Sequence, residues 1–151
     1  ASGFLWVEPG TPDLARAVVQ ARERLGENFD FIAPCLHQKE CGMIAPQNAG
    51  HWCHFFAEPA PHFFQSADWA RFSKELQIDL RSLPVSYLVG VRKSAERAHA
   101  APRVIGRPRV SKGFTKVLVC EAEGVSEKVL RPGKKQKKEF QQVIFSRKLE
   151  K

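Results

Sequence analysis

Short apolar runs and one amphipathic stretch alternate over the first 33 residues. Residues 4–7 form an apolar run that stops at a Pro- and Gly-rich turn, and residues 29–33 form a second run. A helix is predicted between them from apolar residues at helical spacing, namely Leu14, Val18, Ala21 and Leu25. Strand, helix and strand joined by short loops predict a right-handed crossover in a parallel sheet, which is the layout of a doubly wound α/β domain.

The pattern changes after residue 34. Residues 35–65 show no clear periodicity, so something besides hydrogen-bond ladders must order them. A helix capped by Asp68 and a buried strand at residues 85–91 are expected next, and the chain from Arg103 onward predicts strands, with a hairpin turn at Glu123 and Gly124. We therefore divide the chain into a strand–helix–strand part (1–34), a cysteine-rich segment (35–65), a helix and strand that complete the sheet (66–101) and a basic β-hairpin region (102–151).

Charge is unevenly distributed along the chain. Of the 151 residues, 1–80 contain 6 Lys/Arg and 10 Asp/Glu, a net of −4, whereas 81–151 contain 18 and 6, a net of +12. A basic half of this size is typical of proteins that bind a polyanion, most often nucleic acid, although a solvated lysine-rich surface is the alternative. No apolar run is long enough to span a bilayer, so no membrane partner is expected.

The basic residues that are candidates for RNA contact fall into two clusters. Gly106 and Gly113 lie in the first cluster and allow the backbone to approach a phosphate closely. Contacts of this kind position a protein on RNA without reading its sequence. The first cluster is Arg103, Arg107, Arg109 and Lys112, and the second is Lys134, Lys135, Lys137 and Lys138.

The chain has four cysteines, Cys35, Cys41, Cys53 and Cys120, with the spacing C-x5-C-x11-C-x66-C. Nothing marks the chain as secreted, and clustered cysteines in a reducing compartment usually bind metal. Four thiolates suit a structural zinc ion or an iron–sulfur cluster, and the absence of C-x-x-C slightly favours the larger cluster. Free buried cysteine is the alternative, above all for Cys120, which lies in an apolar run. A further possibility is that one of three histidines replaces a cysteine as ligand: His37, His51 or His54.

The order of several short motifs resembles one known family. The matching residues are Val7-Glu8-Pro9-Gly10-Thr11-Pro12, Ala33-Pro34-Cys35 with Cys41, His51-Trp52-Cys53-His54-Phe55, Ser86-Tyr87-Leu88, Arg103-Val104-Ile105-Gly106-Arg107-Pro108 with Lys112-Gly113, and Cys120. Together they are similar to the methyltransferase-like mitochondrial small-subunit ribosome factors of the Rsm-twenty-two type, a family that also has bacterial members. The resemblance covers most of the chain and is weaker after residue 121.

The resemblance implies a fold, a cofactor and partners. The fold is the C-terminal half of a Rossmann-like class I methyltransferase, with a cysteine-rich metal-binding insertion and a β-rich basic C-terminal part. The implied cofactor is a four-iron, four-sulfur (4Fe-4S) cluster held by Cys35, Cys41, Cys53 and Cys120. The implied partners are small-subunit rRNA and ribosomal proteins, in the mitochondrial matrix or, in the alternative, the bacterial cytoplasm.

One departure from the family is large. The Gly-rich turn that cradles S-adenosylmethionine has no counterpart here, and no G-x-G occurs in the chain. Glu8 and Gly10 lie where a strand ends, near the expected cofactor crevice, but one loop is not a site. We therefore expect that this chain alone does not bind S-adenosylmethionine or methylate. Three explanations stay open: the methyltransferase half is a separate chain, it lies outside these 151 residues, or this protein has lost it.

The sequence thus predicts a cluster-stabilised rRNA-binding component or assembly factor of the small ribosomal subunit. Two alternatives remain open from the residues alone. The first is the second half of an S-adenosylmethionine-dependent rRNA methyltransferase, and the second is an RNA-binding module stabilised by zinc.

Overall fold

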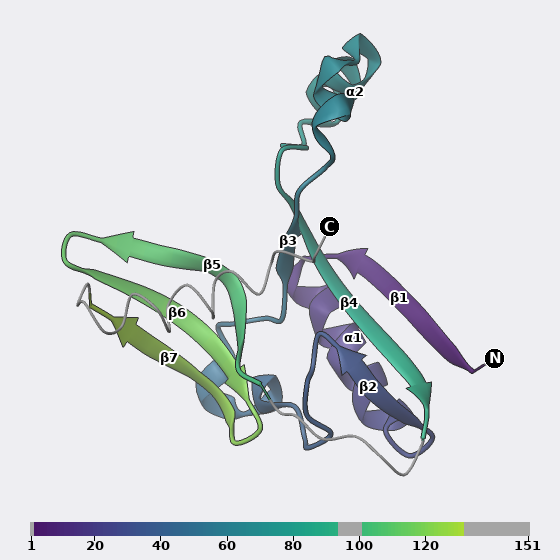
Figure 1. The fold of residues 1–151 in the computed structure, drawn as a ribbon, viewed down its shortest axis with the longest axis vertical. Helices are drawn as coiled ribbons and strands as arrows, with labels where there is room; N and C mark the ends of the chain where they lie inside the picture. Colours follow the sequence, from purple (N-terminus) through teal and green to yellow (C-terminus); the bar gives the residue numbers. More distant parts are fainter. Residues whose placement is uncertain (1, 94–100, 132–151) are drawn as a thin grey trace.

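The computed structural model describes residues 2–93 and 101–131. This part of the chain forms two sheets, a long helix beside the first sheet and an arm that ends in a second helix (Figure 1). The elements are β1 (Gly3–Pro9), α1 (Pro12–Leu25), β2 (Phe29–Ala33), η1 (Gly42–Ile44), η2 (Pro46–Asn48), β3 (Phe55–Ala57), η3 (Pro61–Gln65), α2 (Ala67–Leu76), β4 (Leu83–Arg92), β5 (Arg103–Ser111), β6 (Phe114–Glu121) and β7 (Gly124–Leu130), where η marks a 3₁₀ turn.

The first sheet has the strand order β1-β4-β2, and β3 pairs with the start of β4. Both β1 and β2 run antiparallel to β4, so they are parallel to each other but not adjacent. The predicted strand, helix and strand are confirmed, whereas the predicted pairing of two neighbouring parallel strands is wrong. A strand from residues 83–92 lies between them, and a hydrophobic pattern cannot reveal which strand a partner from elsewhere in the chain will join.

Helix α1 covers one face of this sheet. Pro12 occupies its first turn, where a missing N–H costs nothing, and the helix ends at Gly26. Its buried residues are Ala15, Val18, Val19 and Arg22, so the buried face is turned from the predicted one, and Leu14 is exposed. Val18 packs in a core with Phe31, Cys35 and Leu88, against which Phe4, Trp6, Leu25 and Phe29 are half-buried.

Gly90 of β4 makes this core possible. It is paired with Phe4 of β1, and a Cβ atom at Gly90 would lie 2.4 Å from the Phe4 ring. The Phe4 ring therefore fills the space that a side chain at position 90 would need. It packs edge to face against the Phe29 ring, with 5.1 Å between the ring centroids.

The second sheet is antiparallel, with the order β5-β6-β7. The predicted hairpin is confirmed as β6 and β7, which turn at residues 122 and 123, and Gly124 has a φ of 135°, which favours glycine. Val117, Val119 and Val125 are buried. The sheet lies beside the first sheet, and the segment with η1 and η2 contacts the end of the hairpin (Figure 1).

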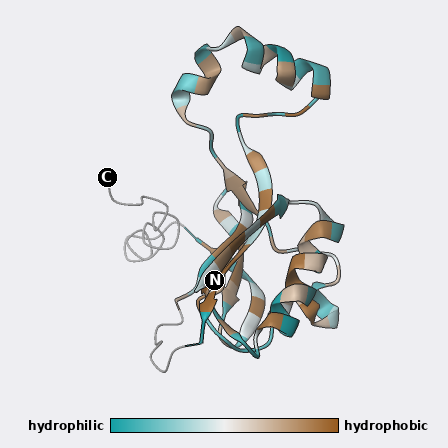
Figure 2. Ribbon diagram, turned by 90° about the vertical axis from the view of Figure 1, so that its right-hand side faces the viewer, coloured by the Kyte–Doolittle hydropathy of each residue, from teal (hydrophilic) through white to brown (hydrophobic). Residues whose placement is uncertain are grey.

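An arm made of η3 and α2 projects from the ends of β3 and β4, away from both sheets (Figures 1 and 2). The predicted helix is confirmed, but its N-cap is Ser66, and Asp68 lies in the first turn instead of at the cap. None of the α2 residues is buried, and apolar and polar residues mix over its surface (Figure 2). No helix in the described residues is long and apolar enough to cross a bilayer.

Candidate functional site

Three of the four cysteines line one small cavity between α1 and β4. Cys35 follows β2 directly after Pro34, and the backbone N–H of Cys41 donates to the Glu23 carboxylate at 3.2 Å. The carbonyl of Cys53 accepts a hydrogen bond of 2.7 Å from the Ser86 hydroxyl of β4. The cavity measures about 10 Å³ and is lined by the three cysteines together with Arg22, Tyr87 and Leu88, among others.

Cys120 of β6 lies beside this group. Its Sγ is 3.5 Å from Nε2 of His37, which is two residues after Cys35. Burial, and then Cys35 and Cys41, raise the pKa of Cys120 to about 12. Burial raises the pKa of Cys53 well above its ordinary value, and Cys35, Cys41 and Cys120 add to that rise. The four thiols are therefore close enough to oppose each other's ionisation, as groups sharing a site do.

The thiols are not arranged around a single point. Within residues 2–93 and 101–131, no three His, Cys, Asp or Glu side chains are grouped so that they could hold one metal ion. A tetrahedral zinc site with bonds of about 2.3 Å would need sulfur atoms roughly 3.8 Å apart. Either a metal ion or a cluster would need more room than the cavity shared by Cys35, Cys41 and Cys53, which barely admits one water molecule.

A clamp between the cysteine-rich segment and the second sheet brings Cys120 to this position. The Nδ2 group of Asn48, a buried side chain, donates to the carbonyl of Gly42 at 2.8 Å and to that of Val125 at 3.3 Å. A Cβ atom at Gly42 would lie 2.6 Å from the Val125 nitrogen. Since Val125 is paired with Cys120 across the hairpin, this contact sets how closely the thiol approaches the others.

Arg22 fixes the first part of the same segment. Its side chain is 3% exposed, and its Nη2 donates to the carbonyls of His37 at 3.1 Å and Lys39 at 2.7 Å. Its Nη1 lies 2.5 Å from the carboxylate of Glu23, which in turn accepts from Cys41. Burial raises the pKa of the Cys35 thiol, and the charge of Arg22 opposes that rise. One arginine thus connects the helix to both Cys35 and Cys41.

The three histidines that could replace a cysteine occupy different places. His37 is buried beside Cys120, and burial lowers its pKa, with the charge of Arg22 adding to the effect. His54 stacks on Trp52 at 4.9 Å, and its carbonyl accepts from Gly106 of β5. His51 is half-buried in the loop after η2. Of these residues, the structure places His37 in contact with a candidate ligand.

The first cluster of basic residues lies on β5 and the turn after it. Arg107 is exposed and lies over the Phe56 ring at 4.1 Å, and Lys112 is exposed in the turn between β5 and β6. Arg109 forms an ion pair with Glu127 of β7. Arg103 is half-buried and donates to the Tyr87 hydroxyl at 3.4 Å, on the side of the strand that faces the cysteines. The second cluster, Lys134, Lys135, Lys137 and Lys138, lies outside the described residues.

Glu8 and Gly10, the candidate cofactor contacts, are engaged within the chain. The Gly10 N–H donates to the Pro84 carbonyl at 2.8 Å, and the Gly10 carbonyl accepts from Trp52 Nε1 at 2.8 Å. Glu8 accepts a hydrogen bond of 2.6 Å from Trp6 Nε1. The two Gly10 bonds join the end of β1 to β4 and to the cysteine-rich segment, whereas the Glu8 bond lies within β1.

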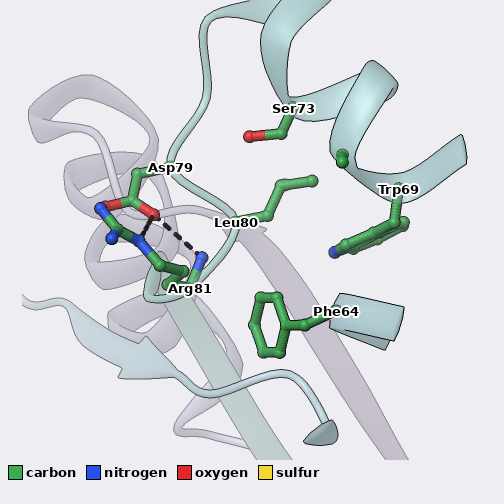
Figure 3. A pocket seen from close by; sticks show the side chains of 7 residues that line it. Phe64, Trp69, Ser73, Asp79, Leu80 and Arg81 are labelled. Carbon is green, nitrogen blue, oxygen red and sulfur yellow. Dashed lines mark hydrogen bonds and ion pairs between the residues drawn. The ribbon is translucent and has the colours of Figure 1, made fainter. Parts of the chain in front are cut away.

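A larger cavity lies on the arm and is lined by none of the cysteines. It measures about 340 Å³ and is lined by Phe64, Trp69, Ala70, Ser73, Asp79, Leu80 and Arg81. Figure 3 shows the aromatic rings and Leu80 around it, with Asp79 and Arg81 paired at its edge. It has no reactive or metal-binding cluster, so the thiol group remains the candidate site.

Arg22 and Asn48 belong to the site but were not predicted from the sequence. Arg22 did leave a signal, since it follows Ala15, Val18 and Val19 at the spacing of one helix face and is the only charged residue on it. A charge at a buried helical position indicates a specific partner. Asn48 leaves no such signal, because its role depends on Val125, which lies 77 residues later.

The chain was also compared with known proteins. The family model described as the mitochondrial small ribosomal subunit Rsm22 matches residues 1–144, which is nearly the whole chain. The comparison with curated proteins finds no match.

Proposed function

The chain belongs to the Rsm22 family of the mitochondrial small ribosomal subunit, and from this premise we propose a specific role in that subunit. Membership indicates a function related to the small mitochondrial ribosomal subunit, with ribosomal partners and a mitochondrial location. We propose that the chain binds small-subunit rRNA through β5 and its following turn, in the matrix, and that a 4Fe-4S cluster on Cys35, Cys41, Cys53 and Cys120 holds its two sheets together.

The observation that carries the proposal is the meeting of all four cysteines of the chain from distant segments. Cys35 follows β2, Cys41 and Cys53 lie in the irregular segment, and Cys120 lies in the second sheet. Burial raises the pKa of Cys53, and Cys35, Cys41 and Cys120 each add to that rise, which is consistent with thiols that lie near one another. Thiolates are the ligands of iron–sulfur clusters, and binding would join the segments that carry the four cysteines through one bonded crosslink.

The chemistry of the surroundings also fits an anionic group. Buried polar atoms near the thiols lack hydrogen-bond partners among the described residues, namely Nε of Arg22, Nδ1 of His37 and Nε of Arg103. Buried polar groups are almost always satisfied in folded proteins, so partnerless nitrogens at one place indicate an absent acceptor. The sulfur atoms of a cluster accept hydrogen bonds of this kind.

The direct test is the metal content of the full chain purified without oxygen. We expect about four iron atoms and as much sulfide per chain, with a brown colour, and loss of both in Cys53→Ser. Zinc without iron would select the zinc-stabilised alternative, and a colourless, metal-free but fully folded protein would refute both. Cys120→Ser tests the link between the sheets, since loss of iron there requires the hairpin thiol to be a ligand.

RNA contact is proposed for Arg107 and Lys112 of the first cluster. Arg107 and Lys112 are exposed, whereas Arg109 is partly neutralised by Glu127 and Arg103 faces the cysteines. Since each phosphate contact releases counterions, binding should weaken steeply with salt, and the double variant Arg107→Gln, Lys112→Gln should reduce the slope by about 1 to 2. An unchanged slope and affinity for small-subunit rRNA would refute this surface.

A second candidate function is favoured by the outer edge of the first sheet. Within the described residues, β1 pairs on one side only, with β4, and its Leu5 and Val7 are 67% and 53% exposed. Long apolar edge strands are rarely left bare, because their unpaired backbone groups can pair with another chain. A separate chain carrying a methyltransferase half would cover them. Methyl transfer from S-adenosylmethionine to rRNA by this chain with such a partner, and by neither alone, would support this candidate.

A further inference from the structure

Partnerless nitrogens gather around the thiols from three separate segments. Among the described residues, four buried side-chain nitrogens or oxygens have no hydrogen-bond partner, and three of these belong to Arg22, His37 and Arg103. The fourth is Nε1 of Trp69, which lies on the arm. Arg22 and His37 are 3% and 7% exposed, so solvent does not satisfy them.

Arg22 and Arg103 approach the thiols from different elements. Arg22 is on α1 and lines the same cavity as Cys35, Cys41 and Cys53. Arg103 is the first residue of β5, directly paired with Cys120 of β6. Its guanidinium donates to the Tyr87 hydroxyl at 3.4 Å, and Tyr87 lines the same cavity as Cys35, Cys41 and Cys53, so the charge lies on the side of the thiols.

The two guanidinium groups are unequally compensated by carboxylates. Arg22 has Glu23 at 2.5 Å, whereas Arg103 makes no ion pair with a described residue and bonds only the neutral hydroxyl of Tyr87 at 3.4 Å. A half-buried cation beside four neutral thiols is costly to hold. One water molecule cannot correct this, because it brings no charge and the cavity of about 10 Å³ is at the lower limit for one.

We infer that Arg103 and Arg22 are the electrostatic partners of the anionic cluster, and that they set its redox potential. This inference depends on the proposed function, since it concerns the group that the four thiolates hold. A cluster that accepts one electron becomes more negative by one charge. A nearby guanidinium stabilises the reduced form more than the oxidised form, and hydrogen bonds to sulfur act in the same direction. Arg103 carries most of the effect because no described carboxylate offsets its charge.

The experiment compares midpoint potentials of the cluster-loaded full chain, with dithionite as the one-electron reductant and absorbance and electron paramagnetic resonance as readouts. The variants are Arg103→Gln, which removes the charge, and Arg103→Lys, which keeps it. A third variant, Arg22→Lys, keeps the positive charge at residue 22. The matched control is Arg24→Gln, because Arg24 is an exposed residue on the same helix as Arg22.

We expect Arg103→Gln to lower the potential so that the ratio of reduced to oxidised cluster falls about tenfold at a fixed potential, which is about 59 mV for one electron. Arg103→Lys should restore most of this shift, and Arg24→Gln should not move the potential. A merely structural arginine would change stability or iron content but leave the potential of the loaded protein unchanged.

The outcomes separate this inference from the proposed function. If the unaltered protein contains no iron, the proposed function fails first. If it contains a cluster and the potential of Arg103→Gln equals its own, the inference is wrong and the function stands. If Arg103→Gln does not load, loading of Arg103→Lys supports the role of charge. If neither Arg103 variant loads, Arg103 serves the assembly of the site and not its potential, and the inference is wrong.

Discussion

The contact between Gly42 and the β6–β7 turn yields the sharpest prediction about how the sheets are joined. A Cβ atom at Gly42 would lie 2.6 Å from the Val125 nitrogen, 2.8 Å from Gly124 Cα and 2.9 Å from the Gly124 carbonyl carbon. Carbon atoms pack at about 3.5 to 4.0 Å, so Gly42→Ala requires the two backbones to separate by roughly 0.8 Å or more. None of the three contacts is a flexible side chain, so no rotamer change relieves the overlap.

The cost follows from what this separation breaks. The Asn48 bond to the Val125 carbonyl is already 3.3 Å long, and the same movement takes it beyond hydrogen-bonding distance. Overpacking costs about 1 to 3 kcal/mol and the lost bond about 1 kcal/mol. The lower entropy of alanine in the unfolded chain returns about 0.4 to 1 kcal/mol. We therefore expect the free energy of unfolding to fall by about 1 to 3.6 kcal/mol, or about 2 to 14 °C in Tm for a chain of this size.

Gly50→Ala is the matched control for thermal denaturation. It makes the same chemical change in the same segment, but a Cβ atom at Gly50 would have no atom within 4 Å. We expect its Tm to equal that of the unaltered protein or to rise by a few degrees through the unfolded state. Equal Tm values for Gly42→Ala and Gly50→Ala would show that the close approach does not join the sheets.

Two further predictions concern the same clamp and the base of the arm. Asn48→Ala removes the donor for the Gly42 and Val125 carbonyls, so urea denaturation should show that the free energy of unfolding falls by about 2 to 4 kcal/mol. The control Gln47→Ala changes an exposed residue and should lower it by about 0.5 kcal/mol or less. Equal effects of the two substitutions would refute the clamp. Hydrogen bonds from Arg81 lower the pKa of Asp79 to about 2. The stabilisation from this pair is therefore complete above the ordinary pKa of an aspartate and is lost as the pH falls through about 2. An NMR titration in Arg81→Gln should return the Asp79 pKa toward about 3.9, and no change would contradict the assignment of Arg81 as its cause.

The arm has a more apolar surface than β5, and several of its charged residues are paired with each other. Phe63, Phe64 and Phe72 are 41–49% exposed, while Arg71 pairs with Glu75 and Arg81 with Asp79. An apolar surface with paired charges has little attraction for phosphate groups. We therefore keep the arm out of the proposed RNA surface and confine that surface to β5 and its following turn.

The sequence by itself determined the local elements of this chain. Periodicity and turn residues predicted β1, α1 and β2 and the β6–β7 hairpin, because these depend on neighbours within a few residues. The motifs also carried the family, which the family model confirms over residues 1–144. The four cysteines were proposed as one site on their spacing and on the family resemblance, and their ligand role remains a proposal.

Tertiary structure alone decided which distant segments meet. It inserted β4 between β1 and β2, turned α1 so that Arg22 faces inward, and brought Arg103 beside the thiols. These features depend on contacts between residues up to 88 positions apart, as in the pairing of Gly3 with Val91. A pattern of apolar positions indicates which residues are buried, but it does not indicate which residues they pack against. The partner of a buried charge is therefore visible only in the folded chain.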